Sequence, residues 1–168
     1  MKFSQVKNSN MSETNHPIEK TFIMIKPDGV ERGLIGEVIQ RFEKKGFQIM
    51  ACQMLIASRQ LLEEHYVELK DKVFFARLIE FMRSGPVIVM VWQGKGIINY
   101  ARKLLGETDP LNSLPGTIRG DWGVDIGRNI CHASDSLKSA QKEISLWFPK
   151  EKGVVNYQRK SIDKLLYE

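Results

Sequence analysis

The sequence predicts a single α+β domain built on a four-stranded antiparallel sheet. Its 168 residues suit one domain. Four short apolar segments are typical of strands, and the stretches between them carry apolar residues at helical spacing. The resulting order is strand, helix, strand, two helices, strand, helix, long loop, strand and helix. This order fits a split βαβ, ferredoxin-like fold in which helices cover one face of the sheet.

The first predicted strand, Thr21–Lys26, is apolar and ends in a turn at Pro27-Asp28-Gly29. Apolar residues from Leu34 to Phe42 then form a helical stripe that ends at Gly46. Phe47–Ala57 follows and is apolar on both alternating faces, which is typical of a strand covered on both sides.

Two helical stripes, Leu61–Leu69 and Phe74–Met82, precede the apolar run Pro86–Trp92, which we interpret as a buried strand. A helix over Ile97–Leu105 comes next. Residues 106–128 are rich in Gly and show few periodic signals, so we expect a long loop there, and such loops are often functional.

The last predicted strand is Asn129–His132, and a final amphipathic helix covers Leu137–Phe148. The cluster Ser134-Asp135-Ser136 favours an N-cap for that helix. His132 therefore comes just before a helix N-terminus, which suits anionic groups. A neutral imidazole there can act as a nucleophile or base. The position alone is also compatible with an ordinary core histidine that is hydrogen-bonded to the backbone.

Composition limits the function classes. The chain is 42% hydrophobic and 27% charged, which excludes a disordered chain, a collagen and a disulfide scaffold. Cys52 and Cys131 lie far apart without a CxxC pair, so we expect a reducing, cytoplasmic environment, with mitochondrial targeting not excluded. The longest apolar run, Pro86–Trp92, is far shorter than the roughly 20 residues of a membrane-spanning helix.

The two ends of the chain differ from the middle. Residues 1–18 are polar, rich in Ser and Asn, and lack both Arg and an apolar core, so we expect a flexible tail. The main domain is therefore predicted to begin at residue 19. Residues 158–168 mix both charge signs with apolar side chains, and we expect this extension to pack on the body or on a neighbouring subunit.

The formal net charge of +5 suggests a polyanionic partner, and a phosphate-binding role is one interpretation of the basic residues. No GxGxxG or GxxxxGK[ST] motif is present. Phosphates would therefore be bound by Lys, Arg and hydroxyl groups with the help of a metal ion. Taken singly, Lys26, Arg102 and Arg119 could equally be solvated surface charges.

Several motifs in order resemble those of the nucleoside diphosphate kinases, over about residues 19–157. The matching segments are Thr21–Arg32, Gly85–Trp92, Arg102 with Leu105–Thr108, Pro115–Asp121 and Asn129–Ser136. One departure is Ala133, where many members have Gly after the histidine. Because every catalytic position that the family would supply is filled, we expect an active enzyme.

The resemblance implies roles for individual residues. His132 would be the nucleophile that becomes a phosphohistidine, Glu143 would orient its imidazole, and Ser134 would support Glu143. The resemblance implies that Arg102, Thr108 and Arg119 bind the phosphates. Lys26 and Asn129 would contact the ribose hydroxyl and the transferring phosphate, with Tyr66 close to that phosphate. The base would stack on Phe74, with Ile126 on its other side.

The implied activity is transfer of the γ-phosphate of a nucleoside triphosphate, typically ATP, to a nucleoside diphosphate by a ping-pong mechanism. Stacking on an aromatic ring is insensitive to base identity, so broad base and sugar tolerance is expected. Mg²⁺ would bind mainly through the nucleotide phosphates, with no protein side chain as ligand. A homo-oligomer is implied, and the ending at Tyr167-Glu168 together with Pro110 favours a hexamer over a tetramer.

Two other functions compete with this one. The basic surplus could support nucleic-acid binding, which we expect only as a secondary role. The same fold could also serve as a regulatory nucleotide sensor. Salt-dependent binding to DNA or RNA would distinguish a nucleic-acid-binding protein from a kinase. Turnover with a second nucleotide would exclude a regulatory nucleotide sensor.

Overall fold

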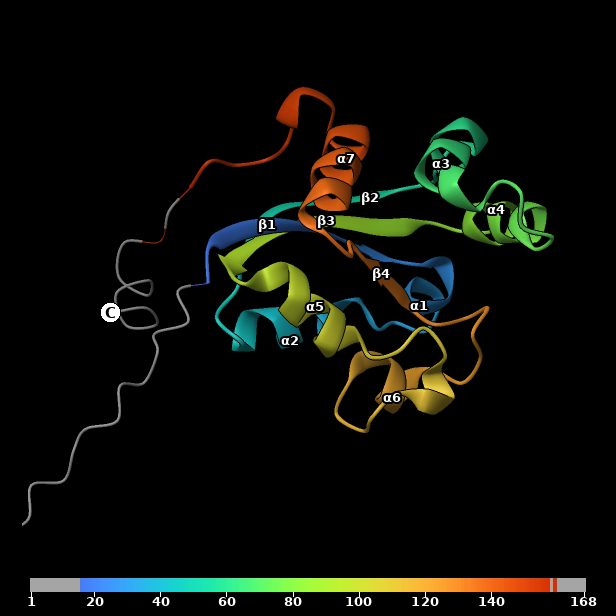
Figure 1. The fold of residues 1–168 in the computed structure, drawn as a ribbon, viewed down its shortest axis with the longest axis horizontal. Coiled ribbons are helices and arrows are strands. Elements are labelled where there is room, and N and C mark those ends of the chain that lie inside the picture. The colour runs from blue at the N-terminus through green and yellow to red at the C-terminus, as the bar shows by residue number, and fades with distance from the viewer. Residues whose placement is uncertain (1–15, 158, 160–168) are drawn as a thin grey trace, which may run out of the picture.

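The computed structural model describes residues 16–157 and 159, and Figure 1 shows a central sheet with helices on both sides. The strands are β1 (Ile18–Ile25), β2 (Gln48–Leu55), β3 (Val87–Lys95) and β4 (Cys131–Ala133). The α-helices are α1 (Pro27–Glu31), α2 (Ile35–Lys44), α3 (Arg59–His65), α4 (Phe75–Arg83), α5 (Ile97–Leu105), α6 (Ile118–Trp122) and α7 (Leu137–Trp147). Short 3₁₀ turns are η1 (Val67–Leu69), η2 (Pro110–Asn112) and η3 (Pro149–Glu151).

The strand order β2-β3-β1-β4, with every pair antiparallel, confirms the predicted ferredoxin-like arrangement. β1 and β3 form the centre of the sheet, with Thr21 opposite Trp92. The short strand β4 pairs only with β1, where His132 stands opposite Met24. The register therefore brings the histidine next to the fully buried middle of the domain.

The expectation of helices on one face is wrong, because both faces of the sheet are covered. Successive side chains of a strand point to opposite faces, and in β1 Ile23 faces one apolar cluster while Met24 faces the other. The helices α2 and α5 pack on the first face, and α3, α4 and α7 pack on the second. Covering both faces explains why β1 and β3 read as continuous apolar runs.

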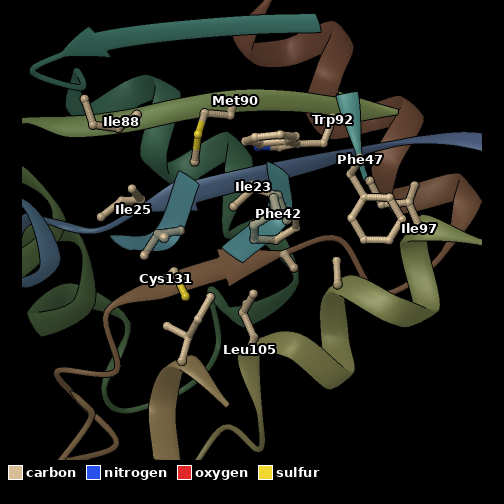
Figure 2. Packing of buried hydrophobic residues seen from close by; sticks show 14 of the residues in the cluster. Ile23, Ile25, Phe42, Phe47, Ile88, Met90, Trp92, Ile97, Leu105 and Cys131 are labelled. Atoms are coloured by element: carbon tan, nitrogen blue, oxygen red, sulfur yellow. The ribbon is translucent and has the colours of Figure 1, made fainter. Parts of the chain in front are cut away.

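Figure 2 shows the first of these clusters, between the sheet and helices α2 and α5. Phe42 of α2 stacks on Trp92 of β3 with ring centroids 5.1 Å apart. Phe47 packs edge-on against Tyr100 of α5 at 5.5 Å. Both Trp92 and Phe42 are completely buried, so this cluster anchors α2 and α5 to the sheet.

Two predicted loop segments contain helices. The turn predicted at Pro27-Asp28-Gly29 is the start of α1, where Pro27 occupies the first turn and needs no N–H donor. The loop predicted over 106–128 contains η2, capped by Asp109, and α6, capped by Thr117. Helices this short lack an apolar repeat, so the only sequence signals are Pro27 at the start of α1 and the capping residues of η2 and α6.

Strand ends also differ from the sequence analysis. β2 is shorter than Phe47–Ala57, and Cys52 and Met54 are exposed, because β2 lies at the edge of the sheet. The last strand begins at Cys131 rather than Asn129, which places His132 in its middle.

The predicted tail, residues 1–18, lies mostly outside the described residues, but Ile18 already belongs to β1. In the predicted extension, residues 158–168, only Arg159 is described, and it donates to the carbonyl of Gly46 at 2.6 Å. Within the described ranges, no helix is long and apolar enough to cross a bilayer.

Candidate active site

His132 points toward the face of the sheet that carries α3 and α7. Its chain neighbours Cys131 and Ala133 belong to the opposite apolar cluster, so alternation along β4 turns the imidazole the other way. Its ring centroid lies 4.8 Å from that of His65 in α3 and 6.1 Å from that of Phe22 in β1. The side chain keeps 24% of its surface exposed, so the ring is positioned by packing and remains accessible.

Glu143 and Ser134 fix the orientation of this imidazole. His132 Nε2 lies 2.9 Å from Oε1 of Glu143, and the hydroxyl of Ser134 donates to the other carboxylate oxygen at 2.6 Å. Glu143 is buried in α7. Because an ionised carboxylate can only accept, this contact requires a proton on Nε2, and in the neutral imidazole Nδ1 then keeps its lone pair. The geometry therefore presents Nδ1 as a nucleophile.

Lys26, Asn129 and Thr108 form a connected chain of polar groups. Lys26 Nζ donates to Oδ1 of Asn129 at 2.6 Å, and Asn129 Nδ2 donates to the carbonyl of Thr108 at 2.8 Å. Burial, together with the positive charge of Arg119, lowers the pKa of Lys26 to about 8. A nearby anion would stabilise the charged amine, so this position suits a phosphate.

Arg119 is 3% exposed and bonds mostly to the backbone. Its Nε donates to the carbonyl of Asn129 at 3.2 Å, and Nη2 donates to that of Cys131 at 2.7 Å. Nη1 donates to the carbonyls of Gly106 and Glu107, both at 3.1 Å. Four of its five N–H donors are thus used. Arg119 connects the end of α5 to the start of β4, so it organises the site as well as carrying charge.

The backbone is strained at Ile130, two residues before His132. Its φ is +71°, a left-handed value that a β-branched residue rarely adopts. The N–H of Cys131 donates to the carbonyl of Asn129 at 2.8 Å across this residue. Asp28 accepts the Ile130 N–H at 2.9 Å, and the Lys26 N–H donates to the Ile130 carbonyl at 2.8 Å. Strain of this kind persists only where surrounding contacts enforce it, commonly at functional sites.

The remaining predicted contact residues are Tyr66, Phe74, Ile126 and Arg102. Tyr66 is buried, and its hydroxyl has no partner among the described residues. Phe74 and Ile126 are 46% and 59% exposed, which leaves both side chains available for stacking. Arg102, in the last turn of α5, lies close enough to Arg119 to help lower the pKa of that guanidinium, although burial is the main cause.

A cavity of about 350 Å³ opens beside His132, between α3 with its following turn and α7. His65, Tyr66 and Glu143 line it together with His132. The other predicted nucleotide-binding residues are not among its lining residues. His132 is therefore accessible from this cavity.

One cluster within the described residues could hold a metal ion. His65, His132 and Glu143 each offer one ligand atom, and these atoms lie within 4.8 Å of one another. Two imidazoles and a carboxylate form a donor set typical of zinc. Mg²⁺ prefers oxygen ligands, so this donor set does not fit Mg²⁺.

Sequence reasoning did not assign a role to His65, Asp28 or Ile130. His65 fell within an apolar helical stripe and was interpreted as part of that stripe. Asp28 fell in a predicted turn, and its contact with Ile130 spans 102 positions of the chain. A histidine in an otherwise apolar helical stripe is the one signal that could have indicated His65.

Residues 19–153 match the family model described as nucleoside diphosphate kinase. The chain is 58% identical over 140 residues to nucleoside diphosphate kinase A 1 of Bos taurus, covering 83% of this chain and 91% of that protein. It is 57% identical over 134 residues to the nucleoside diphosphate kinase of Acaryochloris marina, covering 80% and 90% respectively.

Solved structures agree with the sequence relatives. A nucleoside diphosphate kinase family protein from Babesia bovis has a TM-score of 0.85 at 46% identity, covering 89% of this chain and 99% of that one. A halophilic nucleoside diphosphate kinase from Halobacterium salinarum, in complex with CDP, has a TM-score of 0.87 at 42% identity, covering 90% and 100%. The fold, the family match and the extent of these similarities show that the chain belongs to the nucleoside diphosphate kinase family.

Proposed function

We propose that this enzyme moves the γ-phosphate of a nucleoside triphosphate, typically ATP, to a nucleoside diphosphate through a phosphohistidine at Nδ1 of His132. The observation that supports this most directly is the 2.9 Å contact between His132 Nε2 and Glu143. This contact supports the tautomer in which Nε2 is protonated and Nδ1 is free to act as the nucleophile.

In the first half-reaction, the Nδ1 lone pair attacks the γ-phosphorus. A nitrogen–phosphorus bond forms, the bond from phosphorus to the bridging oxygen breaks, and the nucleoside diphosphate leaves with that electron pair. Glu143 stabilises the positive charge that develops on the ring. A terminal oxygen of a second nucleoside diphosphate then attacks the same phosphorus, and His132 is regenerated. One site serves both nucleotides in turn, which predicts ping-pong kinetics.

We assign the other residues the roles that the family resemblance implies. Lys26, Arg102 and Arg119 would neutralise phosphate charge, which is most of what a protein contributes to phosphoryl transfer. Asn129 and Thr108 would place Lys26 and the phosphates. Phe74 and Ile126 are exposed and would contact the two faces of the base, so base and sugar tolerance is expected to be broad.

Mg²⁺ is proposed to bind through the nucleotide phosphates. When bound there, it would neutralise the charge of the phosphate oxygens. The donor set of His65, His132 and Glu143 does not fit Mg²⁺, so we assign no protein ligand to the Mg²⁺ ion.

Labelling with γ-labelled ATP tests the proposed intermediate. We expect one label per chain, in a bond that acid breaks and base does not. Adding unlabelled nucleoside diphosphate should remove the label from the protein and yield labelled triphosphate. A protein that never becomes labelled while catalysing net transfer would require direct transfer between two bound nucleotides instead.

The lowered pKa of Lys26 predicts a pH-dependent affinity for ADP. Bound phosphates favour the charged amine and so raise its pKa above about 8. Above that pH the free enzyme must take up a proton to bind, so the dissociation constant should rise, by about ten-fold per pH unit at most. Titrations with ADP from pH 7 to pH 10 measure this.

The matched variant is Lys26→Gln, which has no titratable amine. It should bind ADP more weakly at pH 7, and its affinity should stay nearly constant from pH 8 to pH 10. Equal pH slopes for the wild type and the variant would assign the dependence to another group.

We also propose a hexamer in preference to a tetramer, with Pro110 near a subunit contact. Pro110 is buried within its own chain at the start of η2, so it shapes the loop that presents the exposed Leu111 and Leu114. Light scattering should give the mass of six 19.3 kDa chains. A mass of four chains would contradict the proposal.

A further inference from the structure

His65 is a buried histidine beside the nucleophile, and the reaction proposed above does not use it. Its side chain belongs to the last turn of α3 and is 8% exposed. Its ring centroid lies 4.8 Å from that of His132, with the two planes at 77°. It also lines the cavity of about 350 Å³ beside His132. The position places a polar nitrogen next to the reacting ring.

Trp147 determines which nitrogen of His65 carries the proton. The indole Nε1–H of Trp147 donates to His65 Nδ1 at 3.1 Å. An indole N–H can only donate, so Nδ1 must be the unprotonated nitrogen. Burial, and then the proximity of the His132 ring, lowers the pKa of His65 well below its usual value. The ring is therefore neutral at physiological pH, with its single proton on Nε2.

His65 Nε2 is buried and has no hydrogen-bond partner among the described residues. The Tyr66 hydroxyl, in the same cavity, is likewise buried and unpartnered. Buried polar groups in proteins are nearly always bonded, and an exception calls for an explanation. Two adjacent buried donors beside one nucleophile indicate that an acceptor enters this space during the reaction.

A metal ion at His65 is the competing interpretation, since His65, His132 and Glu143 lie close enough to form a ligand set. A metal on Nε2 of a neutral imidazole requires the proton on Nδ1. That proton would point at the Trp147 N–H, which already donates to Nδ1. Glu143 is also bonded to both Ser134 and His132. The contacts therefore favour a hydrogen-bond donor at Nε2 over a metal ligand.

We propose that the Nε2–H of His65 donates a hydrogen bond to the phosphoryl group carried by His132, which makes His65 a catalytic residue. This inference rests on the phosphohistidine proposed above. The phosphoryl oxygens are anionic acceptors, and hydrogen bonds to charged groups are the stronger kind. Tyr66 supplies a second donor, and Lys142, also in the cavity lining, adds a positive charge. The hydrogen bond stabilises the phosphoenzyme without forming or breaking a further covalent bond.

The first test measures the equilibrium between ATP with free enzyme and ADP with phosphoenzyme. His65→Leu removes the donor and should lower the equilibrium constant for phosphoenzyme formation at least about ten-fold. His65→Gln supplies an amide that can both accept from Trp147 and donate, so it should restore most of that loss. Glu64→Gln, at an exposed position of the same helix, is the control and should leave the equilibrium unchanged.

The second test uses nitrogen-15 NMR of the wild-type protein and does not depend on a variant that folds. In the resting enzyme His65 Nε2 should show the shift of a protonated nitrogen, and its proton should move downfield on phosphorylation. An unprotonated Nε2, a proton that does not move, or equal losses in the Leu and Gln variants would overturn the inference.

Failure of the two proposals can be told apart. A wild-type protein that takes no label refutes the phosphohistidine and this inference with it. A wild type that is labelled normally, with an unmoved His65 proton, refutes the role of His65 alone.

Discussion

Replacing His132 with asparagine is expected to lower turnover at least about ten-thousand-fold, the size of effect seen when a covalent nucleophile is removed. The amide nitrogen of Asn has no free lone pair, so the nitrogen–phosphorus bond cannot form. Asn can still donate a hydrogen bond to Glu143, which keeps the buried carboxylate partnered. Steady-state rates with two nucleotides, and labelling with γ-labelled ATP, measure the two parts of the effect.

The affinity of His132→Asn for ADP separates chemistry from binding. The Lys26, Asn129 and Thr108 chain does not involve the imidazole, so ADP affinity should change less than about three-fold. Ser134→Ala serves as a milder comparison, because it removes the 2.6 Å bond to Glu143 and the longer contacts of the hydroxyl with the Phe22 backbone, while the imidazole stays in place. A His132→Asn protein that still becomes labelled would place the phosphoryl group on another residue.

The central sheet could be predicted because its pattern is long and local. β1 and β3 are buried on both faces, and such runs differ clearly from the amphipathic helices between them. The predicted one-sided covering was wrong because an apolar run shows that both faces are buried without showing what covers the second one. Only the register of the sheet shows that α3, α4 and α7 cover that second face.

The active site was harder to predict because its contacts join distant parts of the chain. Glu143 lies 11 positions after His132 and entered the sequence analysis only through the family resemblance. Asp28 and Ile130 meet across 102 positions, and His65 meets Trp147 across 82. No local pattern encodes such pairs. The residue types at the site could be named from motifs, whereas their protonation and their hydrogen-bond partners required the fold.

Arg119 is the clearest example of a residue that a motif could name but whose hydrogen-bond partners required the fold. Its replacement should have the largest effect on stability. Arg119→Met removes the donors to four carbonyls, those of Gly106, Glu107, Asn129 and Cys131. Leaving buried acceptors without donors should lower the free energy of unfolding by about 3–5 kcal/mol. Denaturant titrations at a fixed protein concentration measure this, since oligomer stability depends on concentration.

Arg102→Met is the matched control, because the structure shows no hydrogen bond or ion pair for Arg102 within the described residues. It should weaken ADP binding while changing the free energy of unfolding by less than about 0.5 kcal/mol. Arg119→Lys should still destabilise the protein, since one ammonium cannot replace a planar fork that spans four carbonyls. If Arg119→Met instead unfolds like the wild type and loses only ADP affinity, Arg119 is a phosphate ligand and its carbonyl contacts contribute little. The family motif assigns Arg119 to the substrate phosphates. The stability measurement therefore decides whether its main role is instead structural, in joining the end of α5 to the strand that carries His132.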